Sequence, residues 1–137
     1  MIEVISYKPE HLAEILLRSC HKGERPNAIS GPALTFTLNG QPIAIFGWYF
    51  ICEGVAQVWG LLSDAIKIRK KEFHKIVMKI IESAFDHYLL RRMQMSVRSG
   101  FHEGLRWAGS LGFKYEGTMK KYGPSGDDYW LLARVVN

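Results

Sequence analysis

The feature that most constrains the fold is a change of hydrophobic period near residue 62. Before it, apolar and polar residues alternate, which is typical of strands with one buried face. Between Phe73 and Tyr88, apolar residues recur three and four positions apart, the pattern of an amphipathic helix. A chain that passes from several strands into a long helix predicts an α+β fold, with helices packed on a mostly antiparallel sheet.

Four strands are expected before this helix, and turn residues separate the last three, which form a meander. Asn39-Gly40 favours positive φ at both central positions of a tight hairpin, and Cys52-Glu53-Gly54 makes the next turn. The expected strands cover residues 33–38, 42–51 and 55–62, and a first strand at Ile2 and Val4 precedes a helix from Pro9 to Cys20. The meander is therefore the centre of the predicted sheet.

The remainder of the chain predicts three more strands and one short helix. A strand is expected at residues 92–97, a helix at 101–110 and two closing strands at 115–122 and 129–135. Gly112 stands where the short helix should end, since glycine readily adopts the left-handed conformation of a C-terminal cap.

Length and composition predict a single domain spanning residues 1–137. With 47% apolar residues the chain can bury a core without a metal or disulfides. No stretch approaches the roughly 18 apolar residues that span a bilayer, so we expect a cytoplasmic protein with no membrane partner. Cys20 and Cys52 lack CxxC spacing and are expected to be buried thiols, and the histidines show no metal-binding spacing, so no metal is predicted.

Positive charge is concentrated where the third meander strand meets the long helix. The chain has a formal net charge of +5 and a sequence pI near 9.3. Residues 64–75 hold five basic residues against two acidic ones, a net charge of +3. Such a concentration suits an anionic ligand such as a nucleotide or a coenzyme.

The order of elements, together with Leu111-Gly112-Phe113-Lys114-Tyr115-Glu116-Gly117, resembles the GCN5-related N-acetyltransferase (GNAT) superfamily. The resemblance implies an α+β fold with six to seven strands, splayed between the fourth and fifth strands and flanked by helices. It also implies acetyl transfer from acetyl-CoA, or another acyl-CoA, to the primary amine of a small molecule or a protein. A homodimer is allowed by the resemblance.

In this superfamily the coenzyme phosphates bind at a glycine-rich loop between the splayed strand and the next helix, because glycine permits close backbone approach. The corresponding stretch here, Ala65-Ile66-Lys67-Ile68-Arg69-Lys70, contains no glycine. Either basic side chains replace the backbone donors, or the stretch is a solvated basic turn and the phosphate site has been lost. The expected cofactor-binding residues are Leu61, Leu62, Lys67, Arg69, Lys70 and Lys71.

The resemblance also implies an asparagine and a tyrosine in the last helix, but Phe101 and Ala108 occupy those places. A base acting through water is then expected from Asp64, Glu103 or His102. Each has a simpler interpretation, as a helix cap, a first-turn acid or a surface residue. The candidate substrate groove consists of Trp48, Trp59, Tyr129 and Trp130, although aromatic residues on strands are more often core.

Two other functions stay open from the sequence. The stretch SDAIKIRKKEFHKIVMKI is similar to the small GNAT-like internal virion proteins of short-tailed phages, which suggests a phage or prophage origin. The absence of the glycine loop, the asparagine and the tyrosine favours the alternative of a catalytically inactive virion or host-interaction protein. Nucleic-acid binding is disfavoured, because the charges occupy one helical turn without interleaved aromatic residues.

Overall fold

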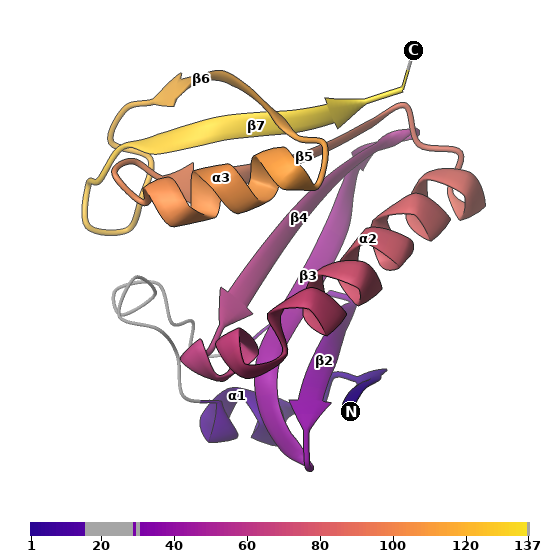
Figure 1. The fold of residues 1–137 in the computed structure, drawn as a ribbon. Coiled ribbons are helices and arrows are strands. Elements are labelled where there is room, and N and C mark those ends of the chain that lie inside the picture. The colour runs from indigo at the N-terminus through magenta and orange to yellow at the C-terminus, as the bar shows by residue number, and fades with distance from the viewer. Residues whose placement is uncertain (16–28, 30, 137) are drawn as a thin grey trace. The chain divides into compact units, whose positions relative to one another are not determined.

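The computed structural model describes residues 1–15, 29 and 31–136 (Figure 1). Contacts within the chain divide it into two compact units. The first unit comprises Met1–Tyr49 and Trp59–Ile81, and the second comprises Phe50–Val58 and Glu82–Asn137. The long strands β3 and β4 and the helix α2 contribute residues to both units.

In the described part of the chain, seven strands pair in the order β1-β2-β3-β4-β5-β7-β6. β4 and β5 are parallel, whereas the pairs β1-β2, β2-β3, β5-β7 and β6-β7 are antiparallel. The strands are β1 (Ile2–Ser6), β2 (Ala33–Leu38), β3 (Gln41–Cys52), β4 (Val55–Leu62), β5 (Arg92–Arg98), β6 (Lys114–Met119) and β7 (Tyr129–Val135). The predicted mixed, mostly antiparallel sheet is therefore confirmed.

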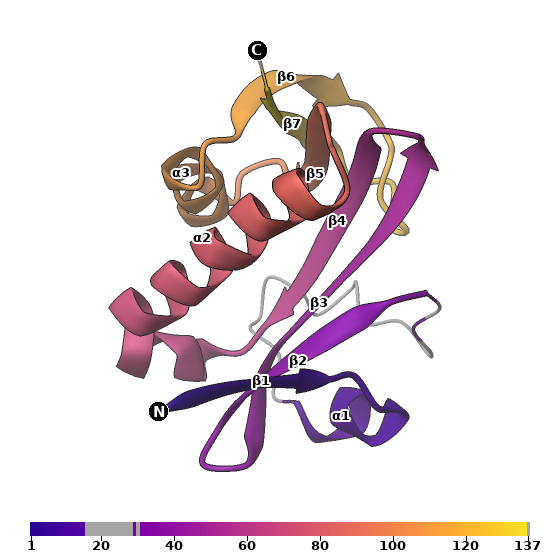
Figure 2. The same ribbon diagram turned by 90° about the vertical axis from the view of Figure 1, so that its right-hand side faces the viewer.

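The first unit is organised around the β2-β3 hairpin. Asn39 and Gly40 have φ of 53° and 79°, the two positive values that a type I′ turn requires. Ile45 of β3 and Leu61 of β4 form a buried cluster with Leu12 of the helix α1 (Pro9–Glu14) and with Ile15, which follows it. Figure 2 shows β1, β2 and β3 as neighbours in this unit.

The helix α2 (Lys70–His87) follows a 3-10 helix, η2 (Asp64–Arg69). Phe73, Val77 and Ile81 are 2%, 6% and 8% exposed, and they form one ridge at a spacing of four residues. The ring of Phe73 packs on Phe36 and Phe46 of the hairpin, with ring centroids 5.3 and 6.0 Å apart. The apolar residues that recur at helical spacing in the sequence therefore include the residues that α2 buries.

In the second unit, the helix α3 (His102–Ser110) lies beside β5 and β7 (Figure 1). Gly112 has φ of 94°, the Phe113 amide donates to the Ala108 carbonyl, and the Gly112 amide donates to the Gly109 carbonyl. These are the two hydrogen bonds of a Schellman motif, so the predicted glycine cap is confirmed. Leu111 and Phe113 beside it are buried.

Three predicted details are wrong. The first helix ends at Glu14, and Ile15 is extended; residues 16–20 lie outside the described residues. The closing strand β6 ends at Met119, because Lys121 turns with φ of 55°. Cys52 is exposed, since it lies at the β3-β4 hairpin end, whereas Cys20 lies outside the described residues. The long amphipathic helix begins at Lys70, directly after a 3-10 helix at Asp64–Arg69 that the sequence did not predict.

No helix in the described part of the chain is both long and apolar enough to cross a membrane. Within that part, no group of three or more His, Cys, Asp or Glu side chains could hold a metal ion.

Candidate functional site

Ser63 ends β4 and starts the helical run. Its amide donates to the Ile43 carbonyl at 2.9 Å, and its buried Oγ accepts from the Ala65 amide at 3.1 Å. The Ile66 amide donates to the Ser63 carbonyl. Two amides of the first turn are therefore engaged inside the turn, and residues 67–71 lie within continuous helix, where amides bond to earlier carbonyls.

We call the helical stretch between the end of β4 and the start of α2 the joint. Its helical structure changes how the basic residues could bind an anion. A glycine-rich loop offers unpaired amides, but here the amides next to Arg69 and Lys70 belong to the end of η2 and the start of α2. The residue at the positive end of the helical dipole is Asp64, itself an anion. Binding of phosphate at this joint therefore depends on side chains.

The four basic side chains differ in how they are occupied. Lys67 Nζ lies 3.7 Å from Asp64 Oδ1, and Arg69 lies 3.9 Å from Glu72 Oε1. Glu72 also accepts from the Ile2 amide at 2.9 Å, which ties η2 and α2 to β1. These ion pairs are loose and exposed, and such pairs contribute little to stability.

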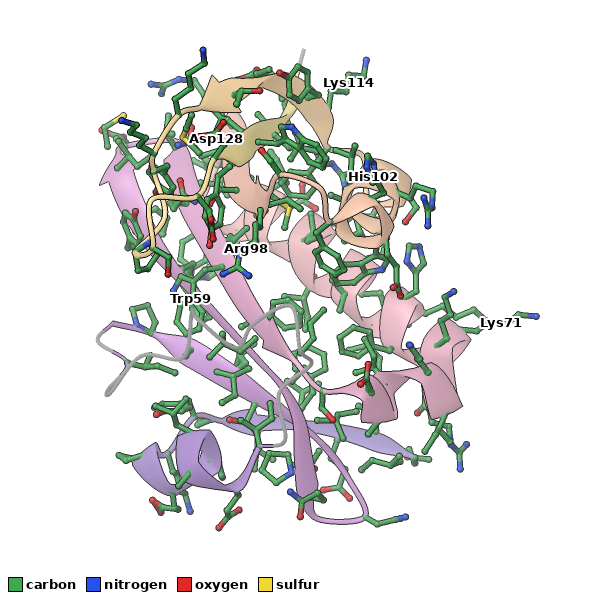
Figure 3. All side chains as sticks on the ribbon, turned by 90° about the vertical axis from the view of Figure 1, so that its left-hand side faces the viewer. Trp59, Lys71, Arg98, His102, Lys114 and Asp128 are labelled. Carbon is green, nitrogen blue, oxygen red and sulfur yellow. The ribbon has the colours of Figure 1, made fainter. Side chains whose placement is uncertain are left out.

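Lys70 and Lys71 are exposed and make no ion pair with a described residue. The Lys71 side chain points away from the ribbon (Figure 3). Of the predicted phosphate-binding residues, these two carry the positive charge that is least neutralised by the protein itself.

The other predicted residues of the first unit have distinct surroundings. Asp64 is exposed beside Lys67. Leu61 and Leu62 are 4% and 7% exposed, so their side chains belong to the core and a ligand would meet mainly their backbone.

Trp59 lies over Gly47 on the neighbouring strand. A Cβ built on Gly47 would overlap the Trp59 indole, so only glycine permits this contact. Trp59 packs against the α1 core cluster, whereas Trp48 follows Gly47 and points to the opposite face, since successive strand residues alternate. The two tryptophans therefore cannot form one wall.

In the second unit, the structure brings His102 and Trp130 together. Their ring centroids are 5.4 Å apart at an interplanar angle of 53° (Figure 3 labels His102). Trp130 pairs in register with Val97 of β5, on the side where α3 packs. Glu103 lies in the first turn of α3 and is exposed.

Tyr129 is separated from this pair, because it precedes Trp130 in the same strand and points to the other face. It is 7% exposed, its ring packs on Tyr122 at 5.5 Å, and a Cβ on Gly123 would come within 2.5 Å of its Cε1 atom. Its surroundings are those of a core residue beneath the β6-β7 turn.

A chain of polar side chains crosses the second unit, and the sequence reading missed it. Gln94 Nε2 donates to Gln57 Oε1 at 2.9 Å, and Arg92 Nε donates to Gln94 Oε1 at 2.9 Å. Arg92 also donates to both carboxylate oxygens of Glu116, at 3.0 and 2.6 Å. The alternation of Arg92, Gln94, Ser96 and Arg98 was a visible signal of a polar strand face.

Arg92 holds the pKa of Glu116 below its usual range, chiefly through this hydrogen bond. Glu116 lies where the β6-β7 register shifts between Tyr115 and Gly117. The Glu-Gly of the quoted motif therefore forms a bulge that presents this carboxylate.

The turn from β5 to α3 contains another polar group. Ser99 Oγ is buried and has no hydrogen-bond partner among the described residues. Ala108, at the place of the superfamily's tyrosine, is fully buried, and Phe101 is the N-cap of α3 without a side-chain cap bond. The structure thus supplies no acid at either place.

Solved structures share this architecture over almost the whole chain. The IAA acetyltransferase from Bacillus cereus ATCC 14579 has a TM-score of 0.77 at 11% identity, covering 99% of this chain and 100% of that one. The ribosomal-protein-S18-alanine N-acetyltransferase from Escherichia coli gives 0.70 at 16% identity, covering 100% and 95%.

A GNAT-family acetyltransferase from Bacillus anthracis gives a TM-score of 0.74 at 11% identity, covering 98% of this chain and 94% of that one. No protein-family model and no curated protein matches the sequence. The likeness therefore lies in the three-dimensional structure, and this chain has the GNAT fold.

Proposed function

We propose that the chain is an acyl-CoA-dependent N-acyltransferase that moves acetyl from acetyl-CoA to a primary amine by direct attack. The observation that carries the proposal is the GNAT fold with two lysines, Lys70 and Lys71, that form no ion pair with any described residue at the start of the helix that follows β4. A fold alone does not define an activity, so the charge at this position is the decisive feature.

The positive charge of the residues at the joint complements the negative charge of the coenzyme phosphates. Lys70 and Lys71 would bind its phosphates as charged donors, with Lys67 and Arg69 available if they exchange their loose partners. The backbone of Leu61 and Leu62 would lie along the coenzyme at the end of β4. Side-chain donors take the place of the amides that a glycine loop would offer.

Bound acetyl-CoA would supply an activated acyl thioester. The protein then needs to orient an amine, accept a proton from its nitrogen and exclude competing nucleophiles. Asp64, His102 and Glu103 are the proposed bases, each acting through water. Among them, His102 is distinguished because Trp130 fixes one side of its ring.

The acceptor is proposed to be a small-molecule or protein amine. Trp130 with His102, and Trp59 separately, remain the aromatic surfaces proposed for it, whereas the burial of Tyr129 favours a structural role. The E. coli protein named above is a ribosomal-protein-S18-alanine N-acetyltransferase, so peptide N-termini should be included among the acceptors tested. Cytoplasmic location and a homodimer belong to the same proposal.

The experiment is an acetylation assay that measures thiol release from acetyl-CoA with small amines and peptide N-termini as acceptors. Lys70→Gln/Lys71→Gln should raise the KM for acetyl-CoA about tenfold or more, since two charge-assisted contacts are lost. The matched control is Lys114→Gln/Lys120→Gln, which removes the same charge from exposed positions in the second unit. Equal effects of the two variants would refute the assignment.

A second candidate is a catalytically inactive GNAT-fold virion or host-interaction protein. The observation that favours it is the helical joint, in which the first-turn amides are engaged and Asp64 occupies the dipole end. Absence of acetyl-CoA binding together with stable capture of a purified phage or host protein would favour this candidate. Thiol release that depends on an added amine would eliminate it.

A further inference from the structure

The outer side of α2 carries a ridge of three lysines that the proposed acyl transfer does not use in full. We name Lys71, Lys75 and Lys79 the lysine ridge. They follow one another at a spacing of four residues, and all three are exposed. Neighbouring lysines on a helix at this spacing repel one another, so the arrangement does not serve the stability of α2.

The buried side of the same helix fixes where the ridge points. Phe73, Val77 and Ile81 are buried, and each stands two residues after a ridge lysine. Two residues turn an α-helix by about 200°, so the lysine ridge lies on the side opposite the core. Figure 3 shows Lys71 pointing outward from α2.

No ridge lysine forms an ion pair with a described residue. Glu72, three residues before Lys75, is already occupied by Arg69 and by the Ile2 amide, and the exposed Glu82, three residues after Lys79, forms no ion pair with a described residue. Among the described residues, the three lysines are therefore without an ion-pair partner along about 12 Å of helix, at a rise of about 1.5 Å per residue.

We propose that the lysine ridge binds the phosphate backbone of double-stranded nucleic acid without regard to sequence. A duplex carries one phosphate per about 3.4 Å of axis on each strand, so each lysine can reach a separate phosphate. Lysine is a flexible point charge suited to phosphate contacts, and the ridge contains no arginine, asparagine or glutamine that could read a base edge. The net charge of +5 adds long-range attraction.

The same observations disfavour two other anionic partners. Single strands are usually held by aromatic side chains between the charges, and the ridge has none. Insertion into an anionic membrane requires an accessible apolar face, but the apolar face of α2 is buried. The sequence disfavoured nucleic-acid binding because the basic residues after β4 occupy a single helical turn. The lysine ridge, in contrast, extends over more than two turns of α2.

The experiment measures binding of the full chain to a labelled 30-base-pair duplex of arbitrary sequence at several salt concentrations. Three phosphate contacts predict a slope of log K against log salt of about −2.7 from the ridge, and loss of two contacts should reduce its magnitude by about 1.8. Lys75→Gln/Lys79→Gln removes these two contacts and lies outside the proposed coenzyme site. Lys114→Gln/Lys120→Gln carries the same change in net charge and should leave the slope unchanged.

The inference would be overturned if the duplex does not bind, if both double variants lower the slope equally, or if the protein binds phosphatidylserine vesicles instead of the duplex. Titration of Lys75→Gln/Lys79→Gln with acetyl-CoA separates this inference from the proposed function. If this variant binds acetyl-CoA like the unchanged protein but shows a smaller salt slope for the duplex, the lysine ridge binds nucleic acid independently of the coenzyme site. If the variant loses both acetyl-CoA binding and the salt slope, the two sites are not independent and the inference is contradicted.

Discussion

Replacement of Gly47 by alanine tests the contact that positions Trp59. A Cβ at this position would come within 2.7 Å of Trp59 Nε1 and closer still to two other ring atoms, so the indole must move. Overfilling a packed site costs about 1–3 kcal/mol, and alanine in a strand recovers about 0.5–1 kcal/mol of backbone entropy. We therefore expect Gly47→Ala to lower the free energy of unfolding by about 1–2 kcal/mol.

Urea unfolding followed by circular dichroism measures this change, and tryptophan fluorescence reports the displacement of the indole. Gly109→Ala is the matched control, because its added Cβ meets no atom within 4 Å and it lies in the helix α3. Alanine there should stabilise the protein by up to about 1 kcal/mol. A Gly47→Ala protein as stable as Gly109→Ala, with unchanged fluorescence, would refute the packing argument.

Two further predictions concern the second unit. Leu89 has φ of 51° and is 84% exposed, and it follows the end of α2, where the Leu90 amide donates a hydrogen bond to the Phe85 carbonyl. Leu89→Gly should raise the urea midpoint by removing about 1 kcal/mol of backbone strain. A lower midpoint would contradict this. Because the folded-state pKa of Glu116 is lowered, its stabilisation is complete above the unfolded-state pKa of about 4.3 and disappears as pH falls through the folded value. Glu116→Gln should therefore cost about 0.5–1 kcal/mol at pH 7, a modest effect because the pair with Arg92 is partly exposed, and the cost should disappear as the pH falls through the folded-state pKa; a cost that does not decrease at acid pH would count against it.

Local patterns predicted the fold well where one signal determines the backbone. The strands Val55–Leu62 and Tyr129–Val135 have the expected bounds, because alternation and flanking turn residues agree. Asn39-Gly40 and Gly112 have the positive φ that their positions required. In each case the information lies within a few residues.

The 3-10 helix Asp64–Arg69 after β4 was not predicted, because the stretch was interpreted from its basic residues alone. The Ser63-Asp64 pair is an ordinary start signal for a helix, and the structure uses it. A reading that gave priority to capping residues over charge would have found the 3-10 helix.

The contacts of the candidate site depend on strand register, which the sequence does not specify. Trp59 meets Gly47, and Gln57 meets Gln94, only because particular residues of neighbouring strands lie opposite one another. The separation of Tyr129 from Trp130 follows from alternation alone and could have been predicted.

The most direct test of the proposed function is a calorimetric titration of the protein with acetyl-CoA and with dephospho-coenzyme A. We expect micromolar binding of acetyl-CoA that weakens when the ribose phosphate is absent, and about tenfold weaker binding by Lys70→Gln/Lys71→Gln. Absence of binding, or equal affinity in the presence and absence of these lysines, would contradict a phosphate site built from side chains at the start of α2.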